Sequence, residues 1–351
     1  MPANLTEQID GFLREKWIPG VVDQVGNMSS LLKILMRSNG VTTIGDATRP
    51  GLSSMVYSGR RIKRTLKVAR VESKGSFKDY SGLKTTPNNK FDACYFYPAN
   101  YYVALPHSFD EKIADQGTEQ VMSWIKTQID NAVPDLLHLI STGLYNNAAA
   151  ITLNWNDEQG YGIHGLRELC DTTRSWADIN STTYTWWEPG LNDATSYSNA
   201  ELSDPTSDNS ILNLIRNGVD SCRKAGREPT HIICSHATFN LIEDYVITNK
   251  IAGMKTDRAS IGYKFIDYRG LEIVPEESDY LPDQYHMFFL RIESGANAPL
   301  QFKGRQGAWF NLTDEHPAFN QMANIRYMVA SGFLVCDEPR LFGMYTGIGN
   351  G

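Results

Sequence analysis

Hydrophobic and polar residues alternate along the first third of the chain. Between residues 61 and 71, apolar and basic side chains take opposite parities: Ile62, Leu66 and Val68 against Arg61, Lys63 and Lys67. A period of two is typical of a β-strand with one buried face. Residues 91–105 are rich in Phe and Tyr, which favour strands. The polar stretch 73–90 between them predicts a long ribbon tip.

Residues 108–145 follow a helical period instead. Apolar side chains recur every three or four residues, at Ile113, Val121, Ile125, Ala132, Leu136, Ile140 and Leu144. This spacing predicts one long helix, or two joined helices if Pro134 interrupts the hydrogen bonding. Asp110 and Glu111 fall in the first turn, where the helix dipole favours negative charge.

The N-terminal arm has short helical patterns at 6–17 and 29–37. Beyond residue 200, segments with the helical period alternate with segments typical of strands. Asp208 is a candidate N-cap for a helix that runs to Ala225. A strand at 230–235 and a helix from 237 to about 249 follow. Further strands are expected at 264–268, 271–274, 285–292 and 325–335. The alternation of these elements predicts an α/β unit followed by long C-terminal strands.

Composition and charge narrow the class of protein. A 351-residue chain with 41% hydrophobic residues is long enough to bury a sizeable core. We expect no membrane span, no secretory signal and no disulfide framework, because no long apolar run is present and the five cysteines are scattered. The net charge of −7 conceals an asymmetry, since residues 46–90 carry +8 and the rest −15. Such asymmetry indicates an interaction.

Catalytic motifs are missing from the sequence. It has no P-loop, no dinucleotide-binding glycine pattern and no G-x-S-x-G elbow. His231, Cys234 and His236 are spaced like metal ligands, but no second pair completes a zinc site, so ordinary packing is favoured. His164 is interpreted as a turn or surface histidine. We therefore predict no catalytic, cofactor-binding or metal-binding residue and no enzymatic activity.

The basic run at 60–70 has three interpretations. The three are a solvated face, a contact with an acidic protein surface, and a nucleic-acid contact of the kind that basic ribbons make. An isolated two-stranded ribbon is marginal in water, so it needs a surface to lie on. The acidic remainder of the chain favours a protein surface.

The order of these features resembles the major capsid protein of tailed bacteriophages, whose fold also forms the floor of herpesvirus capsids. The features are an arm, a basic ribbon, a long helix with an acidic start, an α/β unit and long C-terminal strands. Three stretches carry the resemblance: the ribbon and helix at 46–145, the helix–strand–helix at 200–244, and the strands at 307–348.

The resemblance implies an α+β fold with defined parts. Residues 1–45 correspond to the N-terminal arm, and 46–105 to the extended β-ribbon loop. Residues 106–200, with the long spine helix, and the C-terminal strands at 299–351 make up the peripheral domain. Residues 201–298 correspond to the α/β axial domain.

The resemblance also implies a function. Copies of the chain would assemble into hexamers and pentamers of an icosahedral capsid that encloses a phage DNA genome. The basic loop of one copy would face the acidic spine start of its neighbour: Arg60, Arg61, Lys63, Arg64, Lys67 and Arg70 against Asp110, Glu111, Asp115 and Glu119. Assembly would take place in the host cytoplasm, and the capsid would form the virion shell. Expected partners are a portal protein, decoration proteins, and DNA bound without sequence specificity.

Some family features are expected to be missing. About 45 residues precede the ribbon, too few for a built-in scaffolding segment, so we expect a separate scaffolding protein and an uncleaved or barely cleaved N-terminus. Some relatives crosslink a loop lysine to a neighbour; the candidates here are Lys74, Lys78, Lys84 and Lys90. The alternatives are an encapsulin-like cargo compartment of the same fold, a basic-ribbon DNA-binding protein and a hydrolase with a histidine site.

Overall fold

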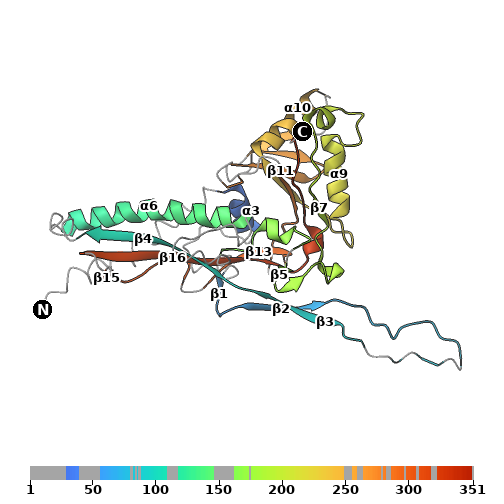
Figure 1. Ribbon diagram of the computed structural model, residues 1–351, viewed down its shortest axis with the longest axis horizontal. Helices are drawn as coiled ribbons and strands as arrows, with labels where there is room; N and C mark the ends of the chain where they lie inside the picture. Colours follow the sequence, from blue (N-terminus) through green and yellow to red (C-terminus); the bar gives the residue numbers. More distant parts are fainter. Residues whose placement is uncertain are drawn as a thin grey trace.

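The molecule is elongated and contains two large β-sheets, their helices and one projecting ribbon (Figure 1). The computed structural model describes residues 29–38, 56–79, 82–83, 85, 88–108, 118–145, 162–173, 175–248, 255–258, 264–277, 280–281, 286–295, 298–305, 308–317 and 322–349. The arm pattern at 6–17 lies outside these ranges. The second arm pattern is confirmed as α3 (Ser30–Ser38).

The first sheet is organised around one long strand, β16 (Ala323–Cys336), which confirms the strand predicted at 325–335. Its longest partner is β4 (Ala99–Ser108), which runs antiparallel to it from Ala323↔Ser108 to Gly332↔Ala99. The remaining strands are short: β1 (Val56–Tyr57), β13 (Leu300–Arg305), β14 (Asn311–Leu312) and β15 (His316–Pro317). The return limb predicted at 91–105 is thus divided, and its second half belongs to the sheet.

A single helix, α6 (Thr118–Tyr145), packs along β4 and β16 (Figure 1). Pro134 lies inside it, so the expectation of one or two helices resolves as one. At 1.5 Å per residue, the helix is about 42 Å long. Its C-terminal half buries Leu136, Ile140 and Leu144 at the predicted spacing. None of the helices in the described ranges combines the length and apolar character that a membrane span requires.

The second sheet has seven strands in the order β7-β17-β12-β8-β11-β10-β9. These strands are β7 (Leu191–Asp193), β8 (His231–Ser235), β9 (Lys255–Arg258), β10 (Lys264–Tyr268), β11 (Leu271–Glu276), β12 (Met287–Leu290) and β17 (Gly343–Tyr345). The helices α8 (Asn199–Ser203), α9 (Ile211–Ser221) and α10 (His236–Thr248) accompany it (Figure 1).

Two local expectations were wrong at their boundaries. The helix predicted from Asp208 to Ala225 is α9, which begins after Ser210 and ends before Cys222. A tight turn follows it, closed by the hydrogen bond from Lys224 N to Arg227 O at 2.9 Å, and this turn cannot be helical. The helix predicted from 237 to about 249 is α10, which begins one residue earlier, at His236, and ends at Thr248.

The C-terminal strands predicted within 299–351 divide between the two sheets. β13 and β16 belong to the first sheet, whereas β17 pairs with β12 and β7 in the second. The chain therefore leaves β16, passes through a 3-10 turn, η5 (Pro339–Leu341), and enters the second sheet. This crossing ties the two sheets together at their junction.

The ribbon consists of β2 (Ile62–Lys67) and β3 (Phe91–Phe96), paired antiparallel from Ile62↔Phe96 to Lys67↔Phe91. It projects away from both sheets (Figure 1). A small hairpin, β5 (Ser175–Trp176) and β6 (Ile179–Asn180), lies at its base. Two short helical segments are close in sequence to this hairpin, α7 (Leu166–Leu169) and η4 (Thr185–Trp187).

Candidate functional site

The two faces of the ribbon have different environments. Ile62, Cys94 and Phe96 are buried on the face that meets the body of the molecule. The opposite face, which carries Lys63 and Lys67 on β2, is exposed. This difference follows from the pleat of the strands, which sends successive side chains to opposite faces. The alternation in the sequence therefore correctly predicted which residues point outward.

The six basic residues predicted to contact a neighbour do not share one environment. Arg60, Lys63, Lys67 and Arg70 are exposed. The Arg64 side chain, 27% exposed, forms an ion pair with Asp337 of the same chain at 3.5 Å. The Arg61 guanidinium lies 4.3 Å from the centroid of the Tyr95 ring. Arg61 and Arg64 thus have partners within their own subunit, and Lys63 Nζ lies 5.9 Å from the centroid of the same Tyr95 ring. Arg60, Lys67 and Arg70 present their charge to solvent.

Several hydrogen bonds hold the base of the ribbon. The β5–β6 hairpin accepts a hydrogen bond from Tyr95 N at Ala177 O, 3.2 Å away. The Tyr97 hydroxyl donates to Asp178 Oδ2 at 3.0 Å. Trp176 Nε1 donates in turn to the carbonyl of Cys336 at 3.2 Å, at the end of β16. The hairpin therefore fastens the ribbon to the first sheet and sets the direction in which it projects.

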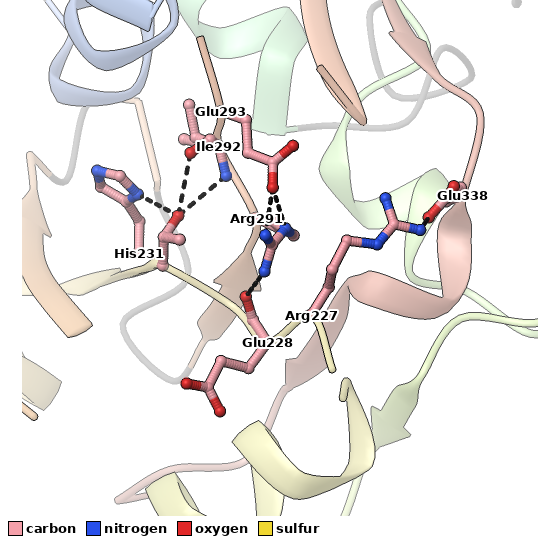
Figure 2. A network of polar contacts seen from close by, with 8 residues as sticks. Arg227, Glu228, His231, Arg291, Ile292, Glu293 and Glu338 are labelled. Carbon is pink, nitrogen blue, oxygen red and sulfur yellow. Dashed lines mark hydrogen bonds and ion pairs between the residues drawn. The ribbon is translucent and has the colours of Figure 1, made fainter. Parts of the chain in front are cut away.

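Two consecutive carboxylates link the ribbon, the first sheet and the second sheet. Asp337 pairs with Arg64 of β2, and Glu338 pairs with Arg227, which precedes β8 (Figure 2). Burial raises the pKa of Asp337, and Arg64 partly opposes that shift. Lys303 of β13 interacts electrostatically with both Arg64 and Asp337. Burial and the positive charge of Arg64 lower the pKa of Lys303.

The Arg227–Glu338 pair belongs to a wider polar network at the start of β8 (Figure 2). Arg291 donates from Nη1 to the carbonyl of Glu228 and from Nε to Glu293 Oε1, both at 2.6 Å. Thr230 Oγ1 accepts from Ile292 N at 3.0 Å. The network satisfies backbone groups where the loop after α9 enters the sheet, so its geometry is that of a structural joint.

Most of the acidic residues predicted to meet the basic loop lie outside the described residues. These are Asp110, Glu111 and Asp115. Glu119 belongs to the first turn of α6, but its side chain is also outside the described set. Their pairing with a neighbour's ribbon stays a prediction. Of the candidate crosslinking lysines, Lys84 is outside the described residues as well.

Among the described residues, the histidines are not grouped as metal ligands. His231 lies 3.4 Å from Glu272, and within the described ranges no group of three or more His, Cys, Asp or Glu residues is arranged to hold a metal ion. His164 Nδ1 lies 2.8 Å from Glu168 Oε1, beside a 240 Å³ pocket under the ribbon base. Burial alone would lower the pKa of His164, but the hydrogen bond and charge of Glu168 raise it overall.

The cysteines are buried and carry no reactive thiolate. All five are free, and burial raises the pKa of the Cys94 and Cys222 thiols to about 12. A thiol with such a pKa is protonated at neutral pH and is a poor nucleophile.

Sequence reasoning missed the residues that anchor the ribbon. Asp337, Glu338, Tyr97 and Asp178 are far apart in the sequence, and each contact depends on the tertiary fold. The only signal in the sequence was the Asp-Glu pair directly after the long strand.

Comparison with known proteins identifies the fold. No family model matches the sequence, and no curated protein matches it. Among solved structures, the capsid asymmetric unit of cyanophage A-1(L) aligns with a TM-score of 0.51 and 13% identity over 84% of this chain and 91% of that one. The capsid of a native GTA particle also has a TM-score of 0.51, with 9% identity over 85% and 89% of the two chains.

Proposed function

We propose, from the bacteriophage capsid-protein fold that this chain has, that it is the repeating subunit of an icosahedral shell enclosing the DNA of a tailed bacteriophage. In this proposal, residues 1–45 are the arm, 46–105 the extended loop and 201–298 the axial domain. The peripheral domain combines 106–200, with α6 as its spine, and 299–351. The subunits form hexamers and pentamers, with a separate scaffolding protein, a portal protein and decoration proteins as partners.

The observation that carries the proposal is the exposed ribbon. Its outer face is basic, and its tip exposes Phe77 by 72% and Leu83 by 70%. Large apolar side chains that project far from the body of their own subunit indicate a surface that another molecule covers. The proposed partner is a second copy of this chain. The chain outside 46–90 carries a net charge of −15, which is opposite in sign to the charge of the ribbon.

The charges of the ribbon would mainly fix the register in which two copies of the chain meet. Each exposed pair contributes about 0–1 kcal/mol, so charge alone does not hold two copies together. Stability would come from the apolar contacts of the tip and from the multiplication of weak contacts in a closed shell. The acidic spine start, with Asp110, Glu111, Asp115 and Glu119, is the proposed counterpart.

The test is electron microscopy of the expressed protein, where we expect uniform shells. Reversing three exposed charges together, Arg60→Glu, Lys67→Glu and Arg70→Glu, should abolish shells and leave soluble, folded subunits. Arg61 and Arg64 are unsuitable targets, because their loss would also disturb contacts within the subunit.

Arg269→Glu is the control outside the ribbon: Arg269 is exposed on the turn between β10 and β11, and its guanidinium lies 5.4 Å from the centroid of the Tyr268 ring. Normal shells from the triple variant would refute the role of the ribbon. The contents of the particles separate the two kinds of shell: DNA supports a phage capsid, whereas a cargo enzyme supports an encapsulin-like compartment.

A further inference from the structure

A groove of 430 Å³ lies in the angle between the ribbon and the second sheet. One wall is β2, with Leu66 and Lys67, and another is the turn between α9 and β8, with Lys224 and Arg227. Trp186 of η4 and Arg340 of η5 also line the groove, together with Asp337 and Glu338. Four basic side chains from three segments therefore surround one hollow, which we call the basic groove.

The carboxylates of the basic groove are already engaged. Asp337 pairs with Arg64, and Glu338 pairs with Arg227. Arg340 donates from Nη2 to the carbonyl of Thr185 at 3.3 Å. Within the described part of the chain, no carboxylate lies within ion-pair distance of the Lys224 or Lys67 ammonium. The basic groove therefore keeps an excess of positive charge.

Lys224 lies within this positive charge. Burial lowers its pKa, and the nearby charges of Arg340 and Arg227 lower it further, with only Glu338 opposing them. An ammonium placed near two guanidinium groups is unfavourable unless an anion joins them. An incoming carboxylate would offset the repulsion among these three cations.

We infer that the basic groove receives a carboxylate-bearing segment of a second copy of this chain. The partly exposed Trp186 offers apolar surface beside the cations, which suits a peptide that carries both acidic and apolar side chains. A second copy supplies such segments, because the chain outside 46–90 carries a net charge of −15. Lys67 also belongs to the outer face of the ribbon, so the basic groove continues the proposed contact surface. The inference rests on the proposed function.

Carbodiimide coupling of assembled particles tests the inference and identifies the partner segment in the same experiment. The reagent joins a lysine amine to a neighbouring carboxylate as an amide. Particles are assembled from equal amounts of isotopically light and heavy chains, digested, and analysed by mass spectrometry. We expect a Lys224 peptide joined to an Asp or Glu peptide of the other isotope. Coupling only to Glu338 of the same copy, or no coupling at Lys224, would overturn the inference.

A variant adds an independent measurement. Lys224→Glu should lower the shell yield by about tenfold, because a small loss at each contact is multiplied over many copies. Arg223→Glu is the control, since Arg223 is adjacent in sequence but lies outside the groove, 3.9 Å from Glu228. An equal loss in both variants would contradict the role of the basic groove.

The outcomes separate this inference from the proposed function. If the unaltered protein forms no shells, the proposed function fails. If shells form but Lys224 is not coupled between copies, only the inference fails. If Lys224→Glu instead lowers the affinity of the subunit for single-stranded DNA without changing the shell yield, a nucleic-acid phosphate occupies the groove, and the second copy is excluded.

Discussion

At the scale of single residues, one buried carboxylate joins three distant parts of the chain. Glu276, only 1% exposed, lies at the end of β11. It accepts hydrogen bonds from Ser29 Oγ and from the backbone N–H groups of Ser30 and Leu31, at 3.1–3.2 Å. The hydroxyl of Tyr145, the last residue of α6, also donates to it. Burial and the adjacent carboxylate raise the pKa of Tyr145, which therefore remains a donor.

The first prediction concerns this joint. Glu276→Gln should lower the free energy of unfolding by about 2–3 kcal/mol, because the amide offers fewer acceptors and leaves buried donors unsatisfied. Chemical denaturation followed by fluorescence measures the change. The same substitution at the exposed neighbour, Glu277→Gln, should have little effect. Equal stabilities for the two variants would show that the joint contributes nothing.

The second prediction concerns pH. Burial, and then the charge of Arg167, lower the pKa of His286 to about 4. Since the unfolded chain binds the proton near pH 6.5, stability is complete above that value and declines as the pH falls towards 4. The decline should be about 2 kcal/mol, less than the full pKa difference gives, because the ring keeps some contact with solvent.

Denaturation midpoints measured between these pH values test the assignment to His286. His286→Asn should remove this part of the pH dependence, whereas a substitution of the exposed His236, such as His236→Asn, should leave it in place. A slope that is unchanged in His286→Asn would contradict the prediction.

At the scale of elements, helix α9 approaches the second sheet closely because it carries a glycine where it crosses β12. A Cβ atom at Gly218 would lie 2.2 Å from the Phe289 ring, which is itself fully buried. The close packing therefore depends on the absence of a side chain, although glycine lowers the intrinsic stability of a helix.

The third prediction follows from that contact. Gly218→Ala should destabilise the protein by about 1–3 kcal/mol, because the steric conflict in a packed core outweighs the gain in helix propensity. Gly75→Ala is the control, since no atom lies within 4 Å of its added Cβ. Thermal unfolding of both variants gives the comparison, and an unchanged midpoint for Gly218→Ala would show that α9 can shift without cost.

Sequence patterns predicted some elements and missed others for identifiable reasons. The strand β16 and helix α6 were predictable because a long periodic run has one buried face. The pairing of β17 with the second sheet could not be predicted, because three residues carry no periodicity and its partners lie far away in the sequence. The β5–β6 turn was missed because Ala177 and Asp178 adopt positive φ angles without the Asn-Gly pattern that normally indicates such a turn.

At the scale of the whole molecule, the ribbon projects from one end and the first sheet extends towards the other (Figure 1). A contact between such different surfaces is heterologous, and it closes into a ring when the rotation between copies permits. The net charge of −7 for the chain includes +8 for residues 46–90, so the ribbon and the remainder have opposite charges.

The fourth prediction concerns assembly. Raising the salt concentration from about 0.05 M to about 0.5 M should slow shell formation, because exposed charges separated by solvent are screened over a few ångströms at high salt. Light scattering during assembly measures the rate. Arg269→Glu should keep this dependence, and the triple ribbon variant should show no assembly at either concentration. A rate independent of salt would show that charge does not guide the contact.

The adjacent carboxylates of Asp337 and Glu338 have a mechanical consequence. One holds the ribbon and the other holds the second sheet, so a single peptide unit lies between the two attachments. The ribbon acts as a lever from this pivot: with a reach of about 40 Å, a rotation of about 10° at its base displaces the tip by about 7 Å. Small changes of torsion at this one site would therefore alter the angle between neighbouring subunits, and with it the curvature of a shell.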